Sequence, residues 1–199
     1  MPTPAPHQLL VEGQNDKHVI WALCTQHRLP EVFSVEVPRE ENTDDGVSVL
    51  LQILPLKLQE EHLLTLGVVV DADQDLLSRW NSVRDRLLAS GLANIPKQPP
   101  VEGWISSQTD LPRVGVWLMP DNQLTGMLES FVALLIPPDD LLRLKAEAVL
   151  QDIEQAGLNR YKSVHRPKAL IHTWLAWQGT PGMPMGQAIT AKALLHDSP

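Results

Sequence analysis

Three acids stand at alternate positions directly after a short apolar run, and their spacing could support chemistry. The run at residues 66–70 is followed by Asp71, Asp73 and Asp75. Its β-branched residues predict a buried central strand. Alternation then places Asp71 and Asp73 on one side of the chain, just past the carboxyl end of the strand, where open α/β sheets bind ligands. Like charges about 4 Å apart repel by roughly 1 kcal/mol in water, and by roughly 4 kcal/mol at an effective dielectric of about 20. The acids therefore need a cation, bound protons or good solvation, and the favoured interpretation is a divalent metal.

A second acidic group follows another predicted strand, at residues 8–11. Glu12 ends that strand, Gly13 permits a tight turn, and Asp16 opens a predicted helix. Adjacent parallel strands would bring their ends together, so we expect Glu12 to lie near Asp71. The alternative is that Glu12 and Asp16 only stabilise the N-terminus of the helix, where an acid is favourable by about 0.3–1 kcal/mol.

Strands and helices alternate through the first half of the chain. The predicted strands are residues 8–11, 33–37, 66–70 and 114–119, and the predicted helices are residues 16–28, 46–58, 75–90, 139–156, 167–178 and 187–195. The order β-α-β-α-β-α implies parallel strands with helices on both faces. We predict an α/β fold with a mostly parallel Rossmann-like sheet and extra C-terminal helices. It forms a single domain, residues 1–199, with a core at about 7–136 and a helical part at about 137–199.

Composition narrows the class of protein. The chain has 199 residues, 43% of them hydrophobic, which suits one domain with a real core. A formal charge of -8 argues against a protein whose whole surface binds nucleic acid, but it permits a local site. The single cysteine, Cys24, excludes an internal disulfide framework and a cysteine-based metal site. No signal peptide or membrane-length apolar run is recognised, so we expect a cytoplasmic protein with no membrane partner.

Three kinds of site begin with alternating acids. A calcium-binding EF loop needs Gly and Glu where this chain has Leu76 and Ser82, so that site is excluded. A phosphatase of the haloacid dehalogenase type would use Asp71 as nucleophile and Asp73 as acid. The third kind is a metal-binding pair of Asp71 and Asp73 assisted by Glu12.

Two motifs carry a resemblance to a known family. Residues 10–16, Leu-Val-Glu-Gly-Gln-Asn-Asp, and residues 69–73, Val-Val-Asp-Ala-Asp, resemble the hallmark motifs of the Toprim domain. This domain occurs in topoisomerases, bacterial primases, small nucleases and the overcoming-lysogenization-defect nucleases of phage conflict. Residues 115–136 and 168–189 more narrowly resemble a Toprim-like family of bacterial proteins, domain of unknown function 3226. The resemblance covers most of the chain.

The resemblance implies a reaction. Family members bind one or two Mg²⁺ or Mn²⁺ ions that act on a phosphodiester, and the matching ligands here are Glu12, Asp71 and Asp73. We therefore expect metal-dependent phosphodiester hydrolysis on nucleic acid, with a role in phage defence. The chain has no ATP-binding glycine loop, so an ATPase or other protein partner would be a separate chain. The alternatives are the phosphatase and a non-catalytic module that binds metal or a partner.

The resemblance extends more loosely to three other residues. Asp16 matches a further metal ligand, Glu129 a later metal-binding Glu, and Lys168 a catalytic Lys that would stabilise negative charge on the phosphate. Glu129 interrupts an apolar segment, where a buried carboxylate must be paired or bind a metal, although it could instead face solvent. Lys168 is expected in the first turn of a helix, where its positive charge is unfavourable beside the helix macrodipole. Anionic groups nearby would offset that cost. Asp75 is expected to be a helix first-turn acid or an outer-sphere ligand, and Asp121 a turn residue.

Overall fold

The computed structural model describes residues 5–38 and 46–197, so the loop predicted at residues 39–45 lies outside the described residues. The chain divides into two compact units, which we call unit 1 and unit 2. Unit 1 comprises Met1–Lys17 and Pro30–Thr125, and unit 2 comprises His18–Leu29 and Gly126–Pro199. Unit 2 thus contains the C-terminal helices, from Gly126 onward, together with most of the first helix.

Unit 1 contains a mostly parallel sheet, which confirms the predicted α/β class. Its strands are β1 (His7–Val11), β2 (Ser34–Glu36), β3 (Thr65–Asp71), β4 (Trp104–Ile105) and β5 (Arg113–Met119), in the order β2-β1-β3-β5-β4. The pairs β1–β2, β1–β3 and β3–β5 are parallel, whereas β4 pairs antiparallel with β5. The short strand β4 was not predicted. The central strand β3 therefore lies between β1 and β5, as its apolar run indicates.

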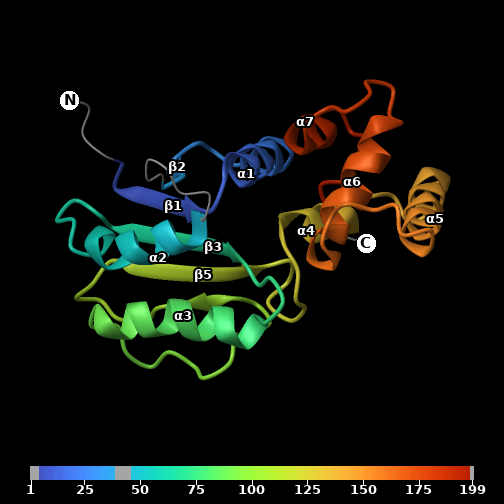
Figure 1. Ribbon diagram of the computed structural model, residues 1–199. Coiled ribbons are helices and arrows are strands. Elements are labelled where there is room, and N and C mark those ends of the chain that lie inside the picture. Colours follow the sequence, from blue (N-terminus) through green and yellow to red (C-terminus); the bar gives the residue numbers. More distant parts are fainter. Residues whose placement is uncertain (1–4, 39–45, 198–199) are drawn as a thin grey trace. The chain divides into compact units, whose positions relative to one another are not determined.

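Helices α2 (Gly46–Lys57) and α3 (Leu76–Ala89) cover the same face of this sheet (Figure 1). Alternate strand residues point into the core between the sheet and these helices. The buried core side chains include Leu10, Leu50, Leu54, Val68, Trp80, Leu87, Val116 and Leu118. Pro55 lies in the last turn of α2. This packing anchors the strands whose carboxyl ends carry the acids.

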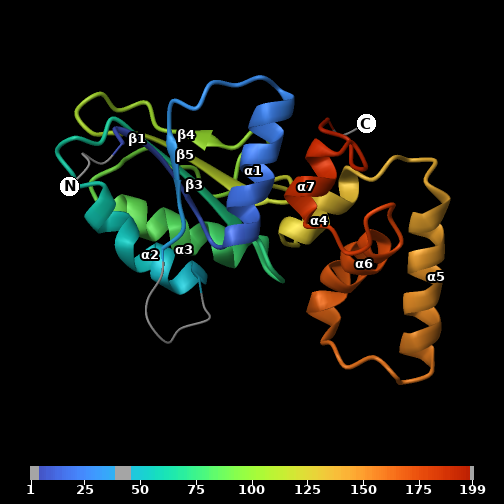
Figure 2. The same cartoon turned by 90° about the horizontal axis from the view of Figure 1, so that it is seen from above.

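Unit 2 consists of helices. It contains most of α1 (Gln14–Gln26), followed by α4 (Leu128–Leu134), α5 (Leu141–Gln155), a short 3-10 turn (Ser163–His165), α6 (Arg166–Ala176) and α7 (Met185–Thr190). Helices α5 and α6 pack side by side (Figure 2). Asp140 caps α5 and also accepts a hydrogen bond from Trp174 Nε1 at 3.3 Å. The predicted C-terminal helices are therefore confirmed.

Two further findings concern Cys24 and membrane spans. Cys24 is buried and forms no disulfide. Within residues 5–38 and 46–197, no helix has both the length and the apolar character that crossing a bilayer requires.

Candidate functional site

The carboxyl ends of β1 and β3 bring Glu12 and Asp71 together. In the parallel register Val11 is opposite Val69. Glu12, which follows β1, therefore lies beside the last residues of β3, which ends at Asp71. Glu12 Oε1 accepts a hydrogen bond from the Asp71 backbone N–H at 2.8 Å. The predicted meeting of these two strand ends is confirmed, and Glu12 is held directly against the first acid of the second motif.

Burial gives Glu12 an unusual protonation equilibrium. The pKa of its carboxyl is raised from 4.5 to about 7, mainly by desolvation, because the charged form loses hydration on burial. The hydrogen bond from Asp71 and the charge of Arg79 act to lower this pKa, while the nearby charges of Asp16 and Asp73 also act to raise it. A carboxylate whose ionisation is disfavoured in this way gains from a nearby cation, which stabilises the charged form.

Two local contacts fix the backbone at Glu12. Asp16, buried in the first turn of α1, accepts a hydrogen bond from Gly13 N at 3.1 Å and so closes the turn after β1. Gly46 begins α2 against the same segment, because a Cβ built there would lie only 2.5 Å from the Glu12 carbonyl oxygen. The turn and the start of α2 together restrict where the Glu12 side chain can point.

Asp73 departs from the strand geometry assumed for it. Its φ of 52° is in the left-handed region, so the alternation that would align it with Asp71 stops before it is reached. The Asp73 carboxylate forms an ion pair with the guanidinium of Arg79. Arg79 Nε also donates to the Asp71 carbonyl oxygen at 2.8 Å. One arginine therefore connects the two aspartates.

Arg79 was missed in the sequence. It lies in the first turn of α3, where its N–H bonds Asp75 O at 3.0 Å, and a cation there opposes the helix macrodipole. The same argument drew attention to Lys168 and could have identified Arg79. Asp75 caps α3, accepting from Ser78 N at 2.9 Å, which confirms it as an acid of the helix start. Asp121 accepts two backbone N–H bonds within its turn, as predicted.

In unit 2 the structure pairs the two remaining candidates. Glu129 lies in the first turn of α4 and Lys168 in the first turn of α6, and the two helices pack together. Lys168 Nζ lies 3.4 Å from Glu129 Oε1, with the Glu129 side chain 5% exposed and that of Lys168 52% exposed. Glu129 is therefore a buried, paired carboxylate, and the alternative of a solvent-facing glutamate is wrong.

The carboxylates of unit 1 suit a hard divalent cation in their chemistry, since Mg²⁺ and Mn²⁺ prefer oxygen ligands. Their arrangement is not that of a ligand cluster: among the described residues, no three or more His, Cys, Asp or Glu side chains are placed to hold a metal ion. Glu12 is bonded to Asp71 N, and Asp73 is paired with Arg79. A metal ion would therefore have to draw these carboxylates closer together and to compete with Arg79 for Asp73.

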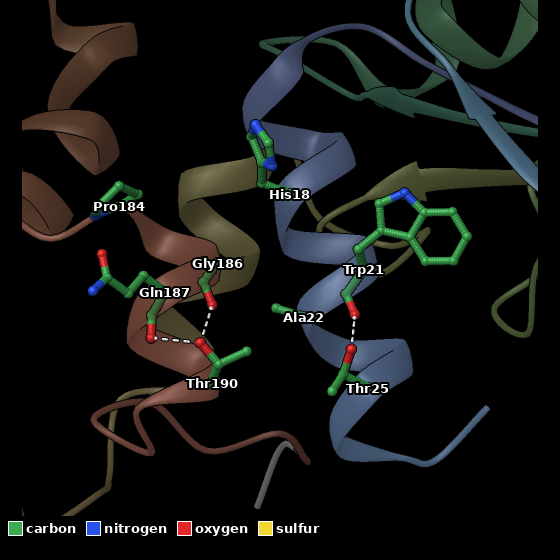
Figure 3. Close-up of a pocket in the computed structure, with 8 residues that line it drawn as sticks. All are labelled: His18, Trp21, Ala22, Thr25, Pro184, Gly186, Gln187 and Thr190. Carbon is green, nitrogen blue, oxygen red and sulfur yellow. Dashed lines mark hydrogen bonds between the residues drawn. The ribbon is translucent and has the colours of Figure 1, made fainter. Parts of the chain in front are cut away.

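A pocket of about 390 Å³ lies in unit 2, between α1 and the start of α7 (Figure 3). Its lining residues are His18, Trp21, Ala22, Thr25, Pro184, Gly186, Gln187 and Thr190. The hydroxyls of Thr25 and Thr190 bond to carbonyls of their own helices, at 2.8 Å to Trp21 O and 3.0 Å to Gln187 O. None of the predicted site residues lines this pocket. The hydroxyl hydrogens of Thr25 and Thr190 are already donated to backbone carbonyls. The pocket therefore does not explain the acids that follow β1 and β3.

Comparison with known proteins gives a family and no activity. The family model described as "Protein of unknown function (DUF3226)" matches residues 6–199. No curated protein and no solved structure gives a significant match. The Toprim relationship remains a prediction from the two motifs. With the match covering nearly its whole length, the chain belongs to the DUF3226 family.

Proposed function

We propose that this protein hydrolyses phosphodiester bonds of nucleic acid with the help of Mg²⁺ or Mn²⁺. The observation that carries the proposal is the meeting of Glu12 and Asp71 at the ends of β1 and β3. Burial there raises the pKa of Glu12 to about 7, which is the electrostatic situation that a bound cation relieves. Two of the charged groups around it, Asp16 and Asp73, are carboxylates of the type that these ions prefer.

In this proposal Glu12 and Asp71 are the principal ligands, with Asp16 and Asp73 completing the set. A bound ion would supply Lewis-acid activation of a phosphate oxygen and of water. The chain supplies orientation, because the Asp71 N–H directs one Glu12 oxygen and the Gly13 turn fixes the backbone from which that side chain extends. The roles that the Toprim resemblance implies for Glu129, as a ligand, and for Lys168, as a catalytic cation, remain predictions.

A plasmid-nicking assay with purified protein and Mn²⁺ tests the proposal. Asp71→Asn should abolish Mn²⁺-dependent nicking, because an amide is a much weaker ligand than a carboxylate. Asp75→Asn is the matched control, since Asn caps a helix as well as Asp does, and it should nick like the wild type. Unchanged nicking by a folded Asp71→Asn variant would refute the proposal.

The same reagents separate the two alternatives. A covalent acyl-phosphate trapped on Asp71 with a phosphomonoester substrate would favour the phosphatase. Mn²⁺ binding by calorimetry, with no cleavage of DNA or RNA, would favour a non-catalytic module.

We also propose that the protein works in the cytoplasm, which is supported by the presence of a single cysteine, since one cysteine cannot form an internal disulfide. An ATPase partner on a separate chain would be tested by co-purification with the full chain.

A further inference from the structure

Arg79 is placed to do more than stabilise its own helix. Its guanidinium donates through Nε to the Asp71 carbonyl oxygen at 2.8 Å and through an Nη to the Asp73 carboxylate. The Arg79 side chain is only 15% exposed, whereas that of Asp73 is 44% exposed. A planar, permanently charged guanidinium with two fixed donors is well suited to neutralising one carboxylate while its other end remains bonded to backbone.

The backbone at Asp73 is adapted to this contact. A φ of 52° is uncommon for a residue with a side chain, and it occurs here two residues beyond Asp71, the last residue of β3. With this conformation the Asp73 carboxylate reaches Arg79 six residues further along the chain. Asn adopts left-handed backbone as readily as Asp does, so Asp73→Asn removes the charge without requiring a new backbone conformation.

A divalent ion at the acids would compete with Arg79. The Asp73 carboxylate already has its charge compensated, and an ion can use it fully only if the ion pair opens. We propose that Arg79 is a built-in counter-cation that competes with the divalent ion for Asp73 and so sets the metal affinity of the site. This inference rests on the proposed metal-dependent function. The Nε bond to Asp71 O does not involve Asp73, so Arg79 can release the carboxylate while remaining attached at the site.

Isothermal titration with Mn²⁺ on the full chain tests the competition. Arg79→Gln should bind Mn²⁺ roughly three- to tenfold more tightly than the wild type, which corresponds to about 0.7–1.4 kcal/mol. The matched control is Arg84→Gln on the same helix, where Arg84 pairs at 3.7 Å with the exposed Asp85. This control loses the same charge and should change the affinity by less than about twofold, because salt screens charges that do not contact the site.

A double-mutant cycle assigns the effect to Asp73. In an Asp73→Asn background, Arg79→Gln should give no gain in affinity, because the carboxylate for which it competes is gone. If Arg79→Gln does not fold, Arg79→Lys replaces it. Lysine keeps the charge but lacks the fork that reaches both Asp71 O and Asp73, so a smaller gain is expected.

A second readout does not depend on affinity. Adding diamagnetic Mg²⁺ to the wild type should shift the guanidinium N–H signals of Arg79 in a ¹⁵N NMR spectrum, and those of Arg84 should remain in place. Mn²⁺ binding by the wild type with no gain in Arg79→Gln, or Mg²⁺ binding with unmoved Arg79 signals, would overturn the inference and leave the proposed function intact. No metal binding by the wild type or any variant would overturn both.

Discussion

Replacing Glu12 with glutamine removes a charge that burial disfavours and keeps the hydrogen bond that positions the side chain. The glutamine Oε1 can accept from Asp71 N as the glutamate does at 2.8 Å. Because the pKa of Glu12 is raised from 4.5 to about 7, the folded protein binds more protons than the unfolded chain between these values. The free energy of unfolding of the wild type should therefore fall as pH rises through this window.

The size of the effect follows from the same pKa. An interval from 4.5 to about 7 corresponds to at most about 3.5 kcal/mol, at roughly 1.4 kcal/mol per pKa unit. Solvent reaches part of the Glu12 side chain, which reduces the expected value to about 1–2 kcal/mol. Glu12→Gln should thus be more stable than the wild type by about 1–2 kcal/mol at pH 8, and it should have no such advantage near pH 4.5.

Urea unfolding followed by tryptophan fluorescence measures this difference, with Trp80 buried in unit 1 as a reporter. The titrations are carried out at pH 4.5, 5.5, 6.5 and 8 with EDTA present, so that trace metal does not stabilise the charged form. Subtracting the wild type from the variant at each pH cancels the other titrating groups. Glu61→Gln, at an exposed position, is the control for loss of one acid.

The expected signature is a difference that grows with pH between about 4.5 and 7 and is then constant. A difference that is the same at all four pH values, or one that shrinks as pH rises, would refute the argument that burial disfavours the Glu12 charge. A pH-dependent gain of equal size in Glu61→Gln would assign the effect to net charge instead.

Two other parts of the structure lead to predictions about stability, with expected free-energy changes of similar size. Gly46→Ala should lower the free energy of unfolding by about 1–3 kcal/mol in urea titrations, because its Cβ would lie 2.5 Å from a backbone oxygen, outweighing the better helix propensity of alanine. The control is Gly179→Ala, where nothing lies within 4 Å of a built Cβ, and it should change the free energy of unfolding by no more than about 0.5 kcal/mol. Equal effects of the Gly46 and Gly179 substitutions would contradict the close approach of Gly46 to the backbone. A double-mutant cycle of Glu129→Gln and Lys168→Gln should give a coupling of about 0.5–1 kcal/mol, modest because Lys168 is half exposed; zero coupling would mean that the pair contributes nothing.

The meeting of Glu12 and Asp71 could be predicted because it depends on short-range patterns. Two apolar runs of strand length, each ending in an acid and separated by two helices and a further strand, leave few arrangements once the connections are right-handed. The local role of Asp75 was predictable for the same reason, since helix starts favour an acid there. Such features are local in the chain or follow directly from strand order.

What could not be predicted depends on single dihedral angles and on long-range contacts. The left-handed φ of Asp73 turns its carboxylate toward Arg79, and no hydrophobic pattern records one residue's dihedral. The strand β4 has only two residues, too few for any alternation to show. The apolar face of α1 indicates that the helix is buried, but not which residues cover it. Most of α1 in fact belongs to unit 2.

The division of α1 has a consequence for how the chain is made on the ribosome. Residues 18–29, which include most of α1, belong to a unit whose other residues begin at Gly126. Translation of the intervening residues 30–125 takes roughly 5–20 seconds at about 5–20 residues per second. During that time Val19, Ala22 and Cys24, all buried in the finished protein, have emerged without the helices that complete their unit. We therefore expect these side chains of α1 to be more accessible to chaperones before residues 126–199 are made than afterwards.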